Sequence, residues 1–501
     1  MRRVGAATGP AEDGRAVHGG PFAPARRGLT IGLLLAVTSN ALTALALVTI
    51  APLIPAELGG LELYGWLFSG YLLASLLGTV WGGTEADRSG LRRPFGAGLG
   101  LFASGLLVAG LAPSMGWVIA ARALQGFGAG ALTTCVYVAV TRAYPDAQRS
   151  RFMALLSSAW VAPALVGPAL AGLVAEAIGW RWVFLGLVPV LGLVAALTLP
   201  RFAAASSRPG VGGGRRDPGL VQALGVVAGL GLALGVLSLG PVAATASGGS
   251  ILLRTAAVVV AGVGGVLVAG AGLRRLLPAG TLRLAPGLGA LVAARGAFFA
   301  AFIGVEAFLA LMLSELHGLP SAGTGAVIAT GAIGWTAGSW WQARRDAGGA
   351  GSVGRGGRVT LGTLVLGLGL ALQGVALAGA GVAGGWVVAA SVAGWLLAGF
   401  GIGIAHATSS VLAFALAESD GVGAGRVSAA LQLGDNVGAA IATGLGGAAL
   451  AFVTVVRIGT DDGGLRAGVA AAFAVAGCAW LLSYVAARRS ARPAPAPATP
   501  P

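Results

Sequence analysis

Long runs of apolar residues recur along this chain of 501 residues, and they restrict its fold more than any other feature. Hydrophobic residues make up 56% of the chain and charged residues only 10%, whereas soluble domains carry roughly 25% charged residues. So few charges cannot cover a surface that faces water, and in lipid the backbone must satisfy its own hydrogen bonds. The chain is therefore predicted to be an all-α polytopic membrane protein.

The length of each apolar run predicts how often the chain crosses the membrane. A helix needs about 20 apolar residues to cross a hydrocarbon core of roughly 30 Å, and this template predicts about fourteen transmembrane helices. The run from residue 29 is longer than a signal-peptide core of roughly 7–15 residues, so we expect it to be retained. The predicted spans are 29–54, 64–84, 94–113, 117–140, 152–174, 182–203, 218–240, 250–273, 287–315, 322–342, 359–380, 384–415, 427–455 and 466–487.

The arginines predict the orientation of these spans. The net charge is +15, and most of the 32 basic residues, all arginines, fall in every second loop or in the tails. Cytoplasmic loops of membrane proteins carry such an excess, so both termini are predicted to be cytoplasmic, in the plasma membrane. The charge is thus a topology signal, and no nucleic-acid partner is expected. The tails 1–28 and 489–501 are predicted to be disordered.

A short pattern occurs twice and predicts an internal repeat. Leu-x-Gly-Phe-Gly-x-Gly fills 124–130 in the fourth of the first six spans and 397–403 in the fourth of the last six. Two matching sets of six helices, with the solute site between them near the bilayer midplane, are a common plan of transporters. We therefore predict six-helix bundles at 29–203 and 286–488, separated by a linker with two extra transmembrane helices at 204–285.

The loop after the second span contains a set of residues suited to a conformational switch. These are Gly83, Asp87, Arg88, Gly90 and Arg92. Glycine permits a sharp turn, and an aspartate at a helix end caps amides or pairs with arginine, which couples neighbouring helices. The alternative is an ordinary arginine-rich loop. The pattern resembles the signature loop of the major facilitator superfamily, Gly-x-x-x-Asp-Arg-x-Gly-Arg-Arg.

The fourth span carries a second motif, built around an arginine inside the membrane. Arg122 is followed by Gln125, Gly126 and Gly130. Charged residues within a span are costly, and their presence indicates function. The motif is similar to the superfamily's Arg-x-x-Gln-Gly-x-Gly-Ala-Gly element, and the resemblance implies a role in proton coupling. The alternative is that Arg122 reaches toward an interface.

A third motif lies in the fifth span. Gly167, Pro168 and Gly172 match the superfamily's antiporter motif, whereas Pro163 and Ala171 replace two of its glycines. Proline allows a bend and glycine a close helix contact. Together the motifs resemble the fourteen-helix drug:proton antiporter branch, which implies the major facilitator fold and antiport. Members of that branch often carry an aspartate in the first span, where this chain has no acid.

Two acids inside predicted spans are candidates for carrying the coupling proton. Glu306 lies in the middle of the ninth span and Asp435 in the thirteenth. Arg295 precedes Glu306 by eleven residues, close to three helical turns, so the two share a face about 16 Å apart. Intramembrane acids usually face a cavity, and either one is a candidate, as is Arg122. The alternative is a structural ion pair with Arg295 or Arg122.

Polar residues within the spans predict a solute cavity. Ser428, Gln432 and Asp435 recur at i, i+4 and i+7 and form a polar stripe. His406 follows the repeat glycines, and for it we favour a packing role over proton transfer. The candidates for lining the cavity are Asn40, Gln125, Arg295 and Gln432.

No enzyme motif accompanies these features. The sequence has no Walker A pattern, no metal-ligand spacing and no nucleophile elbow, so we expect no enzyme activity, cofactor or metal. The predicted function is proton-coupled antiport that exports amphipathic small molecules or drugs by alternating access. We expect protons, a small-molecule substrate and membrane lipid as partners, and a monomer. The alternatives are an importer, a lipid or metabolite carrier, or a non-transporting membrane sensor.

Overall fold

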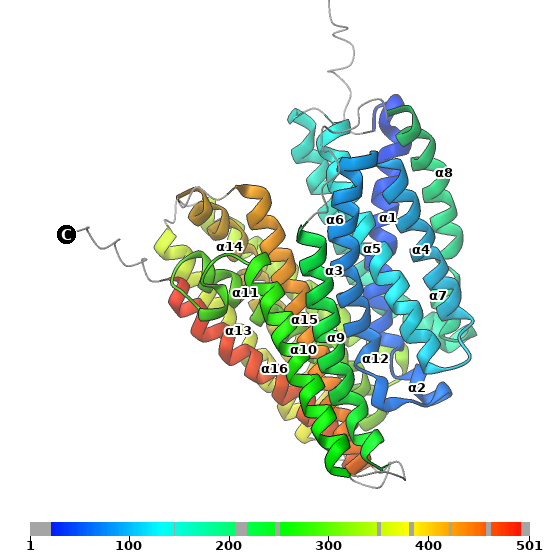
Figure 1. Cartoon of the computed structure of the whole chain (residues 1–501), viewed down its shortest axis with the longest axis vertical. Helices are drawn as coiled ribbons and strands as arrows, with labels where there is room; N and C mark the ends of the chain where they lie inside the picture. The colour runs from blue at the N-terminus through cyan, green and yellow to red at the C-terminus, as the bar shows by residue number, and fades with distance from the viewer. Residues whose placement is uncertain are drawn as a thin grey trace, which may run out of the picture.

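Helices form all the regular structure of the described residues (Figure 1). The computed structural model describes residues 22–144, 146–205, 218–245, 251–347, 352–379, 385–419, 423–456 and 462–491. The predicted disordered tails, apart from a few residues at their inner ends, therefore lie outside the described residues. The all-α fold predicted from the apolar runs is confirmed for the described part of the chain.

The long helices follow the predicted spans in order, and short helices join some of them. The short ones are α2 (Leu53–Leu58), α7 (Arg181–Leu185), 3-10 turns at Leu61–Leu63 and Thr281–Arg283, and a π-helical turn at Met312–Leu316. The long ones are α1 (Pro24–Ile50), α3 (Trp66–Ser89), α4 (Arg92–Gly110), α5 (Met115–Ala143), α6 (Asp146–Ile178), α8 (Val188–Ala205), α9 (Pro218–Thr245), α10 (Ile251–Leu276), α11 (Leu288–Leu311), α12 (Ser321–Ala347), α13 (Ser352–Ala378), α14 (Trp386–Ser419), α15 (Ala424–Val456) and α16 (Asp462–Ser490).

Twelve helices of the described chain are long and apolar enough to cross a membrane. The helices α4 and α12 lie at two further predicted spans but are not among the twelve. A multi-pass helical membrane protein is therefore confirmed, while the count of fourteen crossings stays a prediction.

Two sets of helices pack mainly among themselves. In the first set, α1 packs on α6 and α8, and α5 packs on α3 and α4. In the second, α14 packs on α12 and α13, and α11 packs on α15 and α16. We call these sets the first and second bundles. Their boundaries along the chain, predicted at 29–203, 204–285 and 286–488, stay predictions.

The repeated glycines make equivalent contacts in the two bundles. A β-carbon at Gly126 or Gly130 of α5 would overlap a backbone carbonyl of α3, and at Gly128 it would overlap α4. In the same way, Gly399 and Gly403 of α14 lie against α12, and Gly401 lies against α13. Only residues without a side chain allow backbones to approach so closely. The sequence repeat thus reflects a repeated helix contact.

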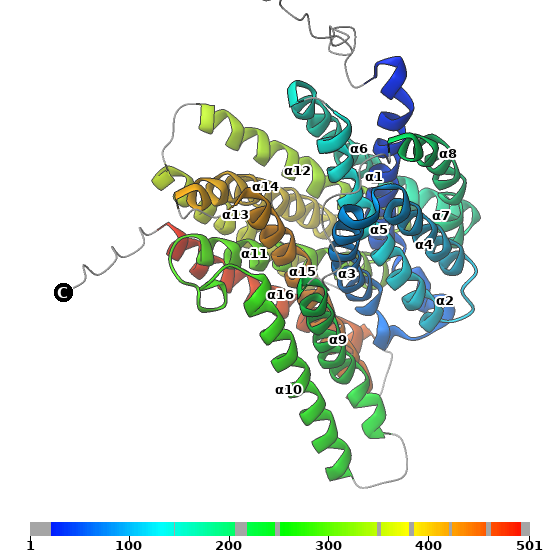
Figure 2. The same cartoon turned by 45° about the horizontal axis from the view of Figure 1, so that its top comes forward.

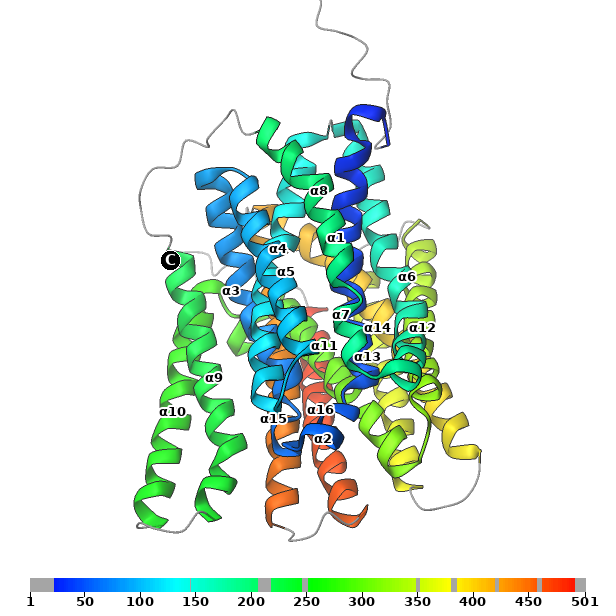
Figure 3. The ribbon, with the colours of Figure 1, turned by 90° about the vertical axis from the view of Figure 1, so that its right-hand side faces the viewer.

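The helices α9 and α10 form a hairpin beside both bundles. The outer helix, α10, packs on α9, and α9 packs on α3 of the first bundle and on α15 of the second. Leu73 of α3, Leu230 of α9 and Val437 of α15 belong to one apolar cluster. Figure 3 shows the hairpin on one flank of the molecule and the pair α6 and α12 on the other, and Figure 2 shows the hairpin reaching away from the bundles.

Contacts between the bundles gather at one end of the molecule. The helices α3, α5, α10, α12 and α16 each carry arginine in their last turn, and we call this the arginine-rich end. At the opposite end, the Tyr64 hydroxyl donates to the Ala307 carbonyl (3.0 Å). Gly65 there lies against Gly447, and the Ala322 amide donates to Glu176 (2.9 Å). The opposite end is therefore where the two bundles are joined.

Candidate functional site

Glu306 is buried in the second bundle and has no partner among the described residues. It lies on α11, whose residues are almost all buried because α14, α15 and α16 surround the helix. Only 9% of Glu306 is exposed, and its carboxylate makes no hydrogen bond or ion pair within the described residues. Keeping an isolated carboxylate charged in such a place is costly, whereas its protonated form is neutral.

Asp435, the other candidate acid, is held by Arg295. The Arg295 Nε lies 3.0 and 3.1 Å from the two carboxylate oxygens of Asp435, and Nη2 lies 2.9 Å from Oδ2. Both side chains are close to fully buried. A buried pair with several charge-assisted hydrogen bonds compensates both charges. The two intramembrane acids therefore differ in their surroundings: in the described part of the chain, Asp435 has a counter-charge and Glu306 has none.

His406 of α14 completes the surroundings of Arg295. The guanidinium donates to His406 Nε2 (2.7 Å) and to the Ser410 hydroxyl (2.6 Å). Because arginine can only donate, His406 Nε2 accepts, and its other ring nitrogen carries the proton. The histidine therefore joins α14 to the ion pair between α11 and α15.

Aromatic rings separate the ion pair from Glu306. Phe299 and Phe302 follow Arg295 at i+4 and i+7 on α11, so they occupy the same helix face as Glu306 at i+11. Phe302 stacks on Trp395 with ring centroids 4.5 Å apart, and Trp335 lies 5.2 Å from the His406 ring. Along one face of α11, the buried cation Arg295 is thus followed first by aromatic rings and then by the acid Glu306.

Arg122, the third proton-coupling candidate, lies in the core of the first bundle. It is 2% exposed and donates to the Leu67 carbonyl (3.0 Å) and to Gln125 Oε1 (2.5 Å). Its guanidinium lies 4.2 Å above the Tyr71 ring. Arg122 therefore packs between α3 and α5 and does not extend to an interface.

The predicted cavity-lining residues lie in different places. Asn40 and Gln125 are buried in the first bundle, where Asn40 accepts a hydrogen bond from Tyr71 and Gln125 donates to the Gly105 carbonyl (2.9 Å). Arg295 binds Asp435 in the second bundle, and Gln432 of α15 is exposed. The structure therefore groups Asn40, Gln125 and Arg122 around Tyr71, apart from the site on α11.

The predicted switch loop forms the turn between α3 and α4. Asp87 Oδ1 lies 2.8 Å from Arg142 Nη2 at the end of α5, and Arg142 Nη1 also donates to the Ala86 carbonyl (3.2 Å). Gly90 has a φ of 80°, a conformation that favours glycine, while Gly83 lies against Thr134 of α5. The other two loop residues, Arg88 and Arg92, are exposed at this turn.

The antiporter-like motif of α6 lies against α12 of the second bundle. Gly325 of α12 has no room for a side chain because the Pro168 backbone fills that space, and Gly172 meets Ser321 in the same way. Gly167 instead faces Leu42 of α1. Two of the three motif residues therefore form part of the junction between the bundles.

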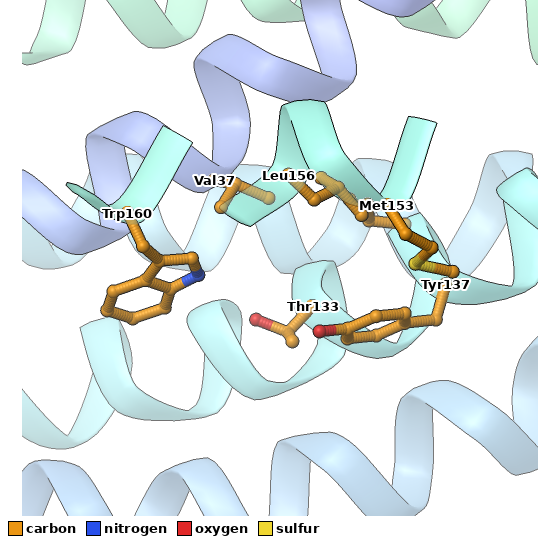
Figure 4. Close-up of a pocket in the computed structure, with 7 residues that line it drawn as sticks. Val37, Thr133, Tyr137, Met153, Leu156 and Trp160 are labelled. Atoms are coloured by element: carbon orange, nitrogen blue, oxygen red, sulfur yellow. The ribbon is translucent and has the colours of Figure 1, made fainter. Parts of the chain in front are cut away.

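A small cavity opens in the first bundle between α1, α5 and α6 (Figure 4). Its volume is about 150 Å³. Thr133 and Tyr137 of α5 place hydroxyl groups on one side, and the Trp160 indole lies on another, with Leu156 and Met153 above them. An apolar wall with a few polar groups suits part of an amphipathic molecule.

Some interacting residues were not identified from the sequence. Arg142 appeared there only as part of the arginine distribution, and Tyr71 carried no motif signal. Glu57 of α2 binds Arg181 and accepts from the Trp180 indole (2.6 Å), and this lowers the pKa of its carboxyl, chiefly through the Arg181 hydrogen bond. The pattern Gly-Trp-Arg-Trp at 179–182 was a signal for this cluster, but its acidic partner lies more than 100 residues earlier in the chain.

The fold and the buried charges define a multi-pass membrane protein with two repeated helix bundles. A family model described as Major Facilitator Superfamily matches residues 31–443, and the chain belongs to this superfamily of transporters. The resemblance read from the motifs is thereby confirmed.

Several relatives in the superfamily are named for drug efflux. A probable multidrug-efflux transporter of Mycobacterium tuberculosis is 34% identical over 187 residues, which are 37% of this chain and 38% of the relative. A multidrug transporter of Bacillus subtilis is 30% identical over 173 residues, 34% of this chain and 32% of the relative. The chain thus matches about a third of the length of these curated relatives. A crystal structure of a peptide transporter shares the fold, with a TM-score of 0.63 at 15% identity over 91% of this chain and 93% of that one.

Proposed function

We propose that the protein exports amphipathic small molecules from the cytoplasm in exchange for protons. The observation that carries the proposal is the unpaired, buried carboxylate of Glu306 on the same helix face as the Arg295 ion pair. Intramembrane acids of this kind typically belong to ion or proton pathways. The efflux names of the relatives support export as the direction.

Glu306 is the proton carrier in this scheme. A proton arriving from outside neutralises the carboxylate, and its departure to the cytoplasm leaves a charge that the apolar surroundings disfavour. The difference in cost between the two states links proton movement to a change of conformation. Asp435 is instead a positioning residue, because Arg295 holds it and Arg295 also donates to His406, so that α11, α14 and α15 are joined.

Alternating access supplies the movement. The bundles meet at the end opposite the arginine-rich one, so export requires that the contacts of Pro168 with Gly325 and of Gly172 with Ser321 separate there. The Asp87–Arg142 pair at the arginine-rich end links α3 to α5. In this scheme the arginine-rich end is cytoplasmic, both termini are cytoplasmic, and a single chain in the plasma membrane performs transport.

The cavity between α1, α5 and α6 is the proposed point of first contact for the substrate. Tyr137 and Trp160 are 43% and 42% exposed, although large aromatic side chains are usually more buried in a helical core. Aromatic faces with nearby hydroxyls contact both the apolar and the polar part of an amphipathic solute. Arg122 lies in the core of the same bundle and holds α5 to α3 through its hydrogen bond to the Leu67 carbonyl.

Transport into liposomes with an imposed pH gradient tests the proposal. The wild-type protein should accumulate amphipathic dyes against their gradient, and the accumulation should collapse with a proton uncoupler. Glu306→Gln should reduce accumulation at least about tenfold. The matched control is Glu315→Gln, because Glu315 follows Glu306 on the chain but is exposed. Accumulation without a pH gradient, or wild-type activity in Glu306→Gln, would contradict proton coupling through this residue.

A further inference from the structure

A basic cavity lies at the arginine-rich end, in the turn between α10 and α11. Its volume is about 300 Å³, and Arg274, Leu277, Leu282 and Arg283 are among its lining residues. Neither guanidinium has a hydrogen bond or ion pair within the described residues, and 251–287 contains no acidic residue. Within the part of the chain that the structure describes, the cavity therefore has two cationic groups without a counter-charge.

The backbone around this cavity is held in an unusual conformation. Among the described residues, Leu284 is the one non-glycine residue with a positive φ, 53°, and Gly280 and Gly287 flank it at 83° and 87°. The turn is fixed by the Ala285 amide, which donates to the Gly280 carbonyl (3.0 Å), and by the Thr281 hydroxyl, which donates to the Pro278 carbonyl (2.8 Å). Strained positions of this kind cluster at binding sites, where the surrounding structure maintains them.

An exposed apolar stripe leads along α10 to the cavity. Val260, Val263 and Leu267 are 71%, 54% and 67% exposed, and their spacing places them on one face of the helix with Arg274. From Val260 to Arg274 the helix rises about 21 Å, more than half of a hydrocarbon core of roughly 30 Å. The opposite face of α10 packs on α9 through Gly265 and Gly229. The stripe therefore faces lipid over the depth of one leaflet and ends at the basic cavity.

We propose that this cavity binds the phosphate group of an anionic phospholipid, with an acyl chain along the stripe of α10. Arg274 and Arg283 complement the negative phosphate, and arginine binds phosphate through paired N–H donors. Leu277 and Leu282 border the glycerol and the first carbons of the chain, and Leu282 is 51% exposed. A phospholipid contacts both the arginines and the apolar stripe, whereas free phosphate contacts the arginines alone. The combination of charge and apolar surface therefore favours a lipid as the ligand.

Native mass spectrometry of the full chain in a neutral detergent tests this site. Phosphatidylglycerol should remain bound as one tight copy per protein, whereas phosphatidylcholine should bind at least about tenfold more weakly. Arg274→Gln and Arg283→Gln should each weaken the tight phosphatidylglycerol copy about tenfold. Arg275→Gln removes the same charge at the same depth but does not line the cavity, so it should change binding by less than about twofold.

Three results would overturn the lipid site. Equal weakening by Arg275→Gln would show a general attraction to positive charge, and equal retention of phosphatidylcholine would remove the anionic preference. Displacement of the lipid by inorganic phosphate at equal concentration would assign the cavity to a free anion. The melting temperature of each variant is measured in parallel, and Leu282→Ser, which keeps both arginines, provides a second weakening variant should an arginine variant not fold.

Discussion

At the scale of single residues, surroundings separate two acids that the sequence offers as equals. Glu306 and Asp435 both lie inside spans, yet Asp435 lies 2.9 Å from Arg295 while Glu306 is buried with no partner among the described residues. A paired acid fixes structure, and an unpaired one is free to change its protonation state. The proposed division of roles therefore follows from one ion pair.

The Arg295–Asp435 pair makes a stability prediction of its own. Arg295→Gln leaves the Asp435 charge buried without compensation, so the free energy of unfolding should fall by about 3 kcal/mol. The double variant Arg295→Met with Asp435→Leu removes both charges and should lose much less. Melting temperatures of Arg295→Gln and of the double variant in detergent, each compared with the wild type, measure the difference. A double variant as unstable as the single one would contradict a compensated pair.

Glu57 predicts how stability depends on pH. Hydrogen bonds from Arg181 and Trp180 lower the pKa of the Glu57 carboxyl below its ordinary value of 4.5. The stability that Glu57 adds to the folded protein is therefore fully present above pH 4.5 and is lost as the pH falls through the lowered pKa. The melting temperature of the wild type should drop more steeply than that of Glu57→Gln below about pH 4.5. The carboxylate is half exposed, so the effect should stay under about 1 kcal/mol. Parallel curves for the two proteins across the whole range would exclude this contribution.

At the scale of helices, glycine contacts set how closely neighbouring backbones approach. Gly130→Ala places a β-carbon against the Ser75 carbonyl, which cannot move aside as a side chain would. The variant should lose about 1–3 kcal/mol of stability, as should Gly399→Ala in the second bundle. Gly100→Ala is the control, because nothing lies within 4 Å of a β-carbon there. Unchanged melting temperatures and yields of Gly130→Ala and Gly399→Ala would contradict the repeated contact.

The same scale shows what the sequence predicts and what it does not. Apolar runs locate helices because the signal is local, so the span predicted at 117–140 lies within α5 and that at 466–487 within α16. The helix α2, with six residues, is too short for a hydropathy template to detect, and the span predicted at 182–203 merges the five-residue helix α7 with α8. Helices this short are stabilised by tertiary contacts, which a local sequence pattern does not reveal.

Partner choice, by contrast, depends on contacts between distant parts of the chain. The sequence left Arg295 and Arg122 as possible partners for an acid, and packing assigns Arg295 to Asp435, 140 residues away, and Arg122 to Gln125 and Tyr71. The switch-loop residue Asp87 of α3 likewise pairs with Arg142 of α5, 55 residues later in the chain. The candidate residues were therefore visible in the sequence, but their pairing was not.

At the scale of the whole molecule, the junction between α6 and α12 is predicted to open during transport. Glu176 of α6 accepts a hydrogen bond from the Ala322 amide of α12 at this junction. A disulfide between Glu176→Cys and Ala322→Cys should reduce the transport rate at least about tenfold, because the bundles cannot separate while the bond is present. Reduction of the disulfide should restore transport. Each single cysteine variant serves as control. Full transport by the cross-linked protein would contradict alternating access at this end.

Comparison of driven transport with simple exchange in Glu306→Gln tests the central claim most directly. Proteoliposomes of one preparation are assayed for dye accumulation driven by a pH gradient and for dye–dye exchange without a gradient. The account predicts that Glu306→Gln loses accumulation but keeps exchange, since the carboxylate links protons to a movement that the substrate can still drive. Accumulation at the wild-type level, or loss of both activities in a folded protein, would contradict it.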